Sequence, residues 1–455
     1  MHLQFLGNFG KDEDGNTANL GSHLFSQFFQ TDIKSALPTI AVKRYLDHQE
    51  PRVREAARRS VVVLSSRDQL AWDELESRIV ALFLGNLSRQ DTEDTVPECQ
   101  TSDGTVTLAH ETVGWKALES TISSIDSLLQ GIQQNSALAS DFSCKITKPL
   151  LWGTLRFCAI HSNRFVRQKA FEALEKVIKC FPEIHITELD AANTKISMSP
   201  DECFEYCQNM KSFSGETLSS GVVTLFAKEL LSLGLMDNWS QVRYASTSAA
   251  ASLLRQISPE DEKYLHKDLL PRICLNRYYV AAGVRNQSQS LWQTLFPAEG
   301  DGQAAVVKNL GAFVEYFVQQ ADADNHAVRE AACHCISELS LKLPTEPLRP
   351  YVLKMLNTLL ECFDDDSWPV RDAACVATGK FVTAFPTESR VLCEEKLIPR
   401  WKAHLWDNIW SVRKNSAISI RRYLQAYGEE VYPVVEQLLQ DYLPSAKQQP
   451  KESKE

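Results

Sequence analysis

The chain has 455 residues, which is too many for one compact core and favours several domains or an extended array of repeats. Its composition, 44% hydrophobic and 23% charged, is ordinary for a soluble protein, and its net charge of −10 argues against a general nucleic-acid coat. No run of about 18 apolar residues occurs, and the start MHLQFLGNFGKDEDGN lacks a basic segment followed by an apolar core, so we expect neither a membrane span nor a secretory signal.

A short motif recurs along the chain. The dipeptide Val-Arg is followed, three residues after the arginine, by Ala or Ser, as in HAVREAA and WPVRDAA. The arginines are Arg54, Arg167, Arg243, Arg285, Arg329, Arg371 and Arg413, and the small residues are Ala57, Ala170, Ser246, Ser288, Ala332, Ala374 and Ser416. Successive arginines are 113, 76, 42, 44, 42 and 42 residues apart. A fixed spacing of this kind indicates a repeat architecture.

Each unit of the repeat is predicted to be a pair of helices. Amphipathic segments such as 303–320 and 348–363 precede the motif, and apolar residues at helical spacing follow it. Asp and Asn in the intervening turn can cap the second helix; they are Asp324, Asn325, Asp366, Asp407 and Asn408. Apolar-proline pairs, such as Phe385-Pro386, are expected to end it.

A period near 42 residues with two helices per unit resembles HEAT repeats, most specifically in the last 215 residues or so. The turn DDDSWPVR resembles the turn inside the HEAT units of phosphatase 2A scaffolds and importin-β-like proteins. The resemblance implies a ladder of ion pairs, in which the aspartate of one turn pairs with the arginine of the next unit. The candidates for this ladder are Arg54, Arg167, Arg243, Arg285, Arg329, Arg371, Arg413, Asp324, Asp366 and Asp407.

In chain order, we predict an all-α fold, an α-solenoid of about eight HEAT-like hairpins over residues 33–443. The segment 1–32 is ambiguous, and 444–455 is predicted to be a disordered tail. The hairpins lie near 33–66, 72–134, 148–181, 218–257, 264–297, 303–343, 348–385 and 391–427, with an acidic loop at 88–110, an inter-repeat insertion at 182–217 and a terminal helix at 431–443.

Motifs of catalysis are missing from the sequence. No glycine-rich phosphate loop, nucleophile elbow or paired-histidine helix occurs, and Cys203 and Cys207 have no partner pair at zinc-ligand spacing. We therefore expect no enzymatic activity, no cofactor, no metal and no small-molecule substrate. The 12 cysteines are scattered through helical segments, which is typical of reduced, buried thiols in the cytoplasm or nucleus.

Three tryptophans, Trp239, Trp368 and Trp410, occur in the turns, two or three residues before the valine of the motif. Turns of successive repeats line up along one ridge, and tryptophan is enriched at the centres of protein interfaces. These side chains are therefore candidate partner contacts. The alternative is that each ring packs on its own second helix.

Residues 396–422 contain seven basic residues against one acid, Asp407, which gives a local charge of +6. Four of these residues are candidates for binding an acidic partner: Lys396, Arg400, Lys402 and Lys414. The alternative is that the charges belong to the arginine ladder and to ordinary solvated surface.

The fold and these candidates predict a non-enzymatic scaffold or adaptor, which presents a concave surface and a ridge to protein partners in a phosphatase or other multiprotein complex. Two alternatives share the fold. They are a transport carrier of importin type and a microtubule- or tubulin-binding array. The expected partners are other proteins rather than nucleic acid.

Overall fold

A computed structural model describes residues 37–48, 50–67, 69–87, 115–135, 149–181, 184–193, 205 and 219–446. Within these ranges every regular element is a helix, so the fold is all-α as predicted. The chain divides into two compact units, Met1–Tyr264 and Leu265–Glu455. No helix in the described ranges is long and apolar enough to cross a bilayer.

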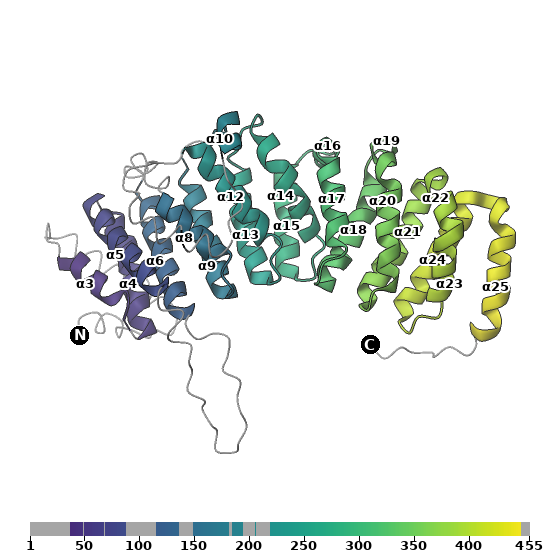
Figure 1. The fold of residues 1–455 in the computed structure, drawn as a ribbon, viewed down its shortest axis with the longest axis horizontal. Coiled ribbons are helices and arrows are strands. Elements are labelled where there is room, and N and C mark those ends of the chain that lie inside the picture. The colour runs from purple at the N-terminus through teal and green to yellow at the C-terminus, as the bar shows by residue number, and fades with distance from the viewer. Residues whose placement is uncertain are drawn as a thin grey trace, which may run out of the picture. The chain divides into compact units, whose positions relative to one another are not determined.

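Unit 1 is a row of helical hairpins (Figure 1). The second helices α4, α6, α9 and α13 pack side by side, and each contacts the first helix of its own hairpin. The helices are α3 (Leu37–Tyr45), α4 (Pro51–Ser65), α5 (Gln69–Leu87), α6 (Trp115–Gln133), α8 (Pro149–Ala159), α9 (Arg164–Lys179), α10 (Glu188–Asn193), α12 (Ser220–Gly234) and α13 (Ser240–Leu254).

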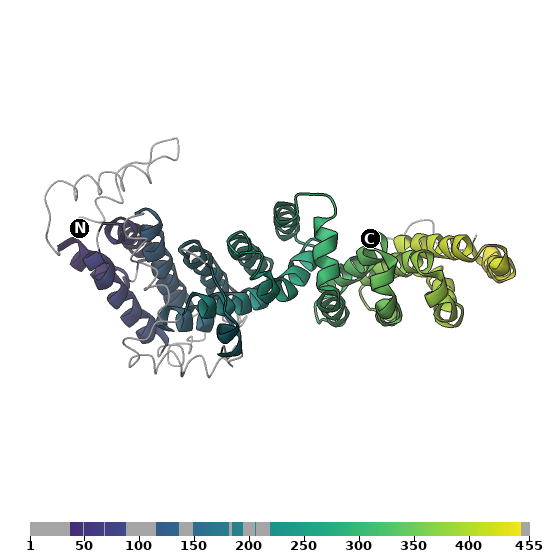
Figure 2. The same ribbon diagram turned by 90° about the horizontal axis from the view of Figure 1, so that it is seen from above.

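Unit 2, taken by itself, is also built of helical hairpins, with second helices α18, α21 and α24 packed in sequence (Figures 1 and 2). Its helices are α14 (Glu262–Asn276), which begins at the end of unit 1, α15 (Ala282–Leu295), α16 (Asp301–Lys308), α17 (Leu310–Gln320), α18 (His326–Lys342), α19 (Thr345–Leu348), η2 (Arg349–Tyr351), α20 (Val352–Glu361), η3 (Cys362–Asp364), α21 (Trp368–Ala384), α22 (Pro386–Leu392), the π-turn η4 (Cys393–Leu397), α23 (Ile398–His404), α24 (Trp410–Tyr427), η5 (Gly428–Val431) and α25 (Tyr432–Ala446).

The small residue of the motif lies on the second helix, and α4, α9, α13, α18, α21 and α24 each pack against a neighbouring second helix. All seven of these residues are 0–2% exposed: Ala57, Ala170, Ser246, Ser288, Ala332, Ala374 and Ser416. A larger side chain at these positions would meet the adjacent helix, because protein interiors are close-packed. The sequence register therefore corresponds to the packing register of the hairpins.

Several first helices are interrupted where the sequence predicted continuous ones. The segment 303–320 is divided into α16 and α17 at Asn309, whose φ of −118° and ψ of 20° are not helical. The segment 348–363 begins with the 3₁₀ turn η2, because Pro350 cannot donate a backbone hydrogen bond. These interruptions bend the first helices without changing the second ones.

Several predicted boundary segments lie wholly or partly outside the described residues. Segments 1–32 and 88–110 fall there, as do Cys203 and Cys207 and all of the insertion 182–217 except 184–193 and 205. At the other end, α25 runs to Ala446, past the predicted end at residue 443, with Pro444 inside its last turn.

Candidate partner-binding surfaces

Each motif arginine first serves its own turn. It lies at the start of the second helix and donates hydrogen bonds back to backbone carbonyls of the preceding turn. Arg371 Nη1, for example, donates to Asp365 O at 2.7 Å and Asp366 O at 3.2 Å. The same two bonds recur at Arg167, Arg285, Arg329 and Arg413. Arg54 donates to His48 O, and Arg243 donates to three carbonyls, of Leu235, Met236 and Asp237. A cation near the positive end of a helix is tolerated here because these carbonyls surround it.

Three of the arginines also pair with a carboxylate from the next hairpin. Their Nε–Oδ2 distances are 2.6 Å for Arg167–Asp237, 2.6 Å for Arg329–Asp365 and 2.9 Å for Arg371–Asp407. These side chains are 9–19% exposed. The pairs are therefore largely shielded from water, where an ion pair has more effect than on an open surface.

The observed ladder differs from the predicted one in direction and, for two residues, in register. Each aspartate pairs with the arginine of the preceding hairpin, not of the next one. The predicted Asp407 does pair, and like Asp237 and Asp365 it lies six residues before the arginine of its own hairpin. Asp324 and Asp366 lie five before it and supply backbone carbonyls to Arg329 and Arg371. At the position six residues before the arginine, Oδ1 also accepts a hydrogen bond from the backbone N–H two residues on, as Asp365 Oδ1 does from Ser367 N at 2.8 Å. Asp237 and Asp407 make the same bond, to Trp239 N and Ile409 N. One carboxylate thus orders its own turn and pairs with the preceding hairpin.

The charges of Arg329 and Asp365 stabilise each other. Burial alone would raise the pKa of Asp365, but hydrogen bonds from Arg329 and from the backbone of Ser367 lower it below its ordinary value. The side-chain hydrogen bond to Asp365 raises the pKa of Arg329. Both groups therefore stay charged in the folded protein.

In unit 2, three tryptophans around the turns before α21 and α24 remain exposed. Trp368 is 41% exposed, Trp406 45% and Trp410 55%. Lys414 Nζ lies 4.9 Å from the centre of the Trp410 ring, and Trp406 packs edge-on against Tyr442. We call Trp368, Trp406, Trp410 and Lys414 the tryptophan surface; sequence reasoning missed Trp406, which lies directly before Asp407.

Trp239, in unit 1, has a different environment. The Arg164 guanidinium lies 3.8 Å from the centre of its ring and 4.8 Å from that of Phe165. Phe165 in turn stacks on Trp115 at 4.9 Å. Trp239 is still 45% exposed, but one face of its ring is covered by this stack.

The basic cluster is partly neutralised within unit 2. Lys402 Nζ lies 2.6 Å from Asp441, and Arg400 Nη2 lies 3.6 Å from Asp364. Lys414 is engaged with Trp410, while Lys396 is exposed and has no ion-pair partner among residues 219–446. The four candidates thus do not form one uncompensated patch.

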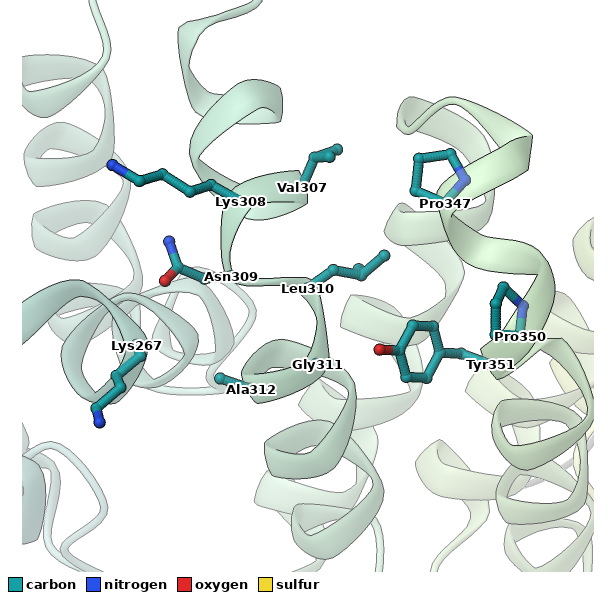
Figure 3. Close-up of a pocket in the computed structure, with 10 residues that line it drawn as sticks. All are labelled: Lys267, Val307, Lys308, Asn309, Leu310, Gly311, Ala312, Pro347, Pro350 and Tyr351. Carbon is teal, nitrogen blue, oxygen red and sulfur yellow. The ribbon is translucent and has the colours of Figure 1, made fainter. Parts of the chain in front are cut away.

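A groove that the sequence did not reveal lies at the break between α16 and α17 (Figure 3). It has a volume of about 540 Å³. Its walls come from α14, from the α16–α17 break and from the next hairpin, and its lining residues are Lys267, Val307, Lys308, Asn309, Leu310, Gly311, Ala312, Pro347, Pro350 and Tyr351. No signal in the sequence marks it, because the three walls are far apart along the chain.

One segment of the chain matches a known protein family. Residues 355–385 match the HEAT repeat family. These residues are a HEAT repeat. The repeat runs from α20 through η3 to the end of α21, and it carries Asp365, Trp368, Arg371 and Ala374. The HEAT resemblance predicted from the sequence is therefore confirmed for this repeat.

Curated protein sequences gave no match to the chain. Among solved structures, Kap121p bound to RanGTP gives a TM-score of 0.43 at 13% identity, covering 98% of this chain and 38% of that one. Kap95p, from a structure with RanGDP, gives 0.35 at 14% identity, covering 98% and 51%. A designed armadillo repeat protein gives 0.30 at 14% identity, covering 61% and 99%.

The most suggestive chemical contact near the HEAT repeat is between a cysteine and a histidine. Cys375 Sγ lies 3.3 Å from His404 Nδ1 and 3.4 Å from Ser416 Oγ. Burial raises the pKa of Cys375 to about 12 and lowers the pKa of His404. Both groups are therefore neutral near pH 7, unlike the thiolate and imidazolium of a cysteine nucleophile. No group of residues in the described ranges has the arrangement of a metal site.

Proposed function

We propose that this protein is a non-enzymatic scaffold, and that the tryptophan surface of unit 2 holds a protein partner. The observation that supports this most is the exposure of Trp368, Trp406 and Trp410 around two consecutive turns. Tryptophan side chains are large and apolar, and their exposure is costly in water unless a partner covers them. Interface hot spots are enriched in tryptophan.

The register of the hairpins strengthens the proposal. Trp368 and Trp410 both lie three residues before their motif arginines, at the starts of the packed helices α21 and α24. Because the arginines fix both turns in the same way, the two rings are presented in equivalent positions. A partner can therefore contact both turns at once.

The chemistry of the partner follows from the partly neutralised charges. Arg400 and Lys402 already contact carboxylates of this chain, so attraction to an acidic partner is weaker than the sequence count suggests. We therefore assign the main contact to the aromatic rings, with Lys396 and Lys414 at the edge. The neutral Cys375 thiol fits a protein without a cysteine nucleophile. Because the cysteines in the described residues are free thiols, we propose the cytoplasm or nucleus as its location.

The test is quantitative partner capture with the full chain. Trp368→Ala with Trp410→Ala should lower capture of the proteins bound by the wild type by about 30-fold, the effect of losing about 2 kcal/mol at a hot spot. Leu341→Ala with Val391→Ala, which removes exposed apolar side chains elsewhere in unit 2, is the matched control. Equal capture by both folded variants would refute the proposal.

The two alternative functions are distinguished by purified ligands. A carrier of importin type should bind GTP-loaded Ran, and a tubulin-binding array should bind tubulin dimers.

Trp239→Ala, in unit 1, should have a smaller effect on capture than the variant in unit 2, because Arg164 already covers part of that ring.

A further inference from the structure

The groove between α16 and α17 exists because the first helix of its hairpin is broken. The Asn309 carbonyl accepts hydrogen bonds from Ala312 N and Phe313 N, so α17 starts afresh at Leu310. Asn309 Nδ2 donates back to Ala305 O at 3.0 Å and closes α16. The break separates the two helix segments and leaves a depression on the first-helix side of unit 2 (Figure 3).

The two sides of the groove differ in chemistry. On one side, Pro347, Pro350 and Tyr351 form an apolar wall that faces Val307 and Leu310 (Figure 3). Gly311 is exposed beside the Tyr351 hydroxyl, and a Cβ placed there would lie 3.4 Å from that oxygen. The groove is open at this point because no side chain fills it.

The other side of the groove is basic. Lys267 and Lys308 are both exposed and flank Asn309. None of the residues that line the groove is an Asp or a Glu, although the chain as a whole has a net charge of −10. The groove therefore has a positive edge beside an apolar wall, and its charge favours an anionic ligand.

We infer that this groove binds an extended peptide segment of a partner protein, in which acidic side chains alternate with apolar ones. In an extended segment successive side chains point to opposite sides, so one set can meet Lys267 and Lys308 while the other packs on Pro347, Pro350 and Tyr351. A volume of about 540 Å³ is in the usual range for ligand sites, which is roughly 300–1,000 Å³.

This site is distinct from the tryptophan surface and does not depend on it. Pro350 and Tyr351 of the groove lie just before α20, whereas Trp368 follows the other end of this 10-residue helix. At a rise of about 1.5 Å per residue, the two ends of α20 are roughly 15 Å apart. A partner could engage one without the other.

The experiment measures fluorescence anisotropy of labelled nonapeptides added to the full chain. The probes alternate Glu with Leu, Lys with Leu, or Glu with Ser. The Glu–Leu peptide should bind about tenfold more tightly than the other two, a difference of about 1.4 kcal/mol. Equal binding of the Glu–Leu and Lys–Leu peptides would overturn the inference, and so would no binding of the Glu–Leu peptide.

Two variants test the two sides of the groove separately. Lys267→Glu with Lys308→Glu should weaken binding of the Glu–Leu peptide by about tenfold, while Lys116→Glu with Lys263→Glu, an equal charge change at exposed positions of unit 1, should not. Gly311→Leu should abolish binding by filling the groove, without loss of thermal stability, because leucine is a better helix former than glycine. Wild-type affinity in both folded groove variants would contradict the proposed site.

Discussion

The turns of unit 2 fall into two kinds that differ by a single carboxylate. Arg329 and Arg371 pair with Asp365 and Asp407 of the following hairpin. Arg285 makes the same bonds to its own turn, but the residue that could pair with it from the next turn is Ala323. The arginine is present in both kinds, so its constant role is to hold the turn. The ion pair between hairpins is an addition.

The largest expected effect comes from removing an arginine of the paired kind. Arg371→Ala should lower the free energy of unfolding by about 3–5 kcal/mol, because it leaves Asp407 shielded from water without its cation. Arg285→Ala should cost only about 1–2 kcal/mol, since it loses two bonds to carbonyls. Urea unfolding followed by circular dichroism compares the two, and equal losses would show that the ion pair adds nothing.

A second pair of substitutions tests whether the packing of the second helices depends on the ion pair made by the motif arginine. Ala374→Leu and Ser288→Leu both enlarge a fully buried small residue, after a paired and an unpaired arginine respectively. Each should cost about 1–3 kcal/mol through overpacking. Thr383→Leu, at an exposed position of the same helix as Ala374, is the control for thermal melting. If Ala374→Leu has the same melting temperature as the control, Ala374 is not a packing contact between helices.

The sequence could predict the hairpins and the buried small residues because both follow from one period. It named Asp407 but could not place Asp365, because DDDSW offers Asp364, Asp365 and Asp366 and capping chemistry alone does not choose among them. A signal was present all the same. Asp237, Asp365 and Asp407 share the position six residues before an arginine, and these three make the pairs seen in the described ranges.

The groove and the tryptophan surface show a different limit. The break at Asn309 falls inside an apolar segment with helical periodicity, and the segment has no proline that would predict it. Exposure of Trp368 and Trp410 depends on which neighbouring side chains reach over each turn, and that is a property of three-dimensional packing. The type of fold was therefore predictable, while the binding surfaces needed coordinates.

Two other carboxylates extend the comparison to pH. Burial raises the pKa of Glu229 to about 7, and Oε2 is buried without a hydrogen bond. Arg156, 3.1 Å from Oε1, acts in the opposite direction and offsets only part of this rise. Burial acts on Glu338 too, but Arg277 and Lys342 together lower its pKa. A raised pKa in the folded state favours folding below the unfolded value of 4.5, and this contribution is lost as pH rises through about 7.

Glu229→Gln should therefore stabilise unit 1 by about 1–2 kcal/mol at pH 8 relative to the wild type, and less at pH 5. Glutamine can still accept from Arg156. Glu338→Gln should have the opposite sign, destabilising the protein at pH 8, because its lowered pKa contributes stability above the unfolded value. Thermal melting of both variants at the two pH values checks this, and parallel pH profiles would contradict the difference between the two sites.

The smallest expected effect is a gain, obtained by converting an unpaired turn into a paired one. Ala323→Asp places a carboxylate six residues before Arg329, where it can meet Arg285 and accept from the backbone N–H of Asn325. We expect a stabilisation of about 0.5–1.5 kcal/mol by urea unfolding. Ala323→Asn supplies the same turn hydrogen bond without the charge, so the difference between the two variants isolates the ion pair. If both variants raise the free energy of unfolding equally, the added stability comes from ordering the turn alone. An aspartate at position 323 would then add no ion pair to the ladder.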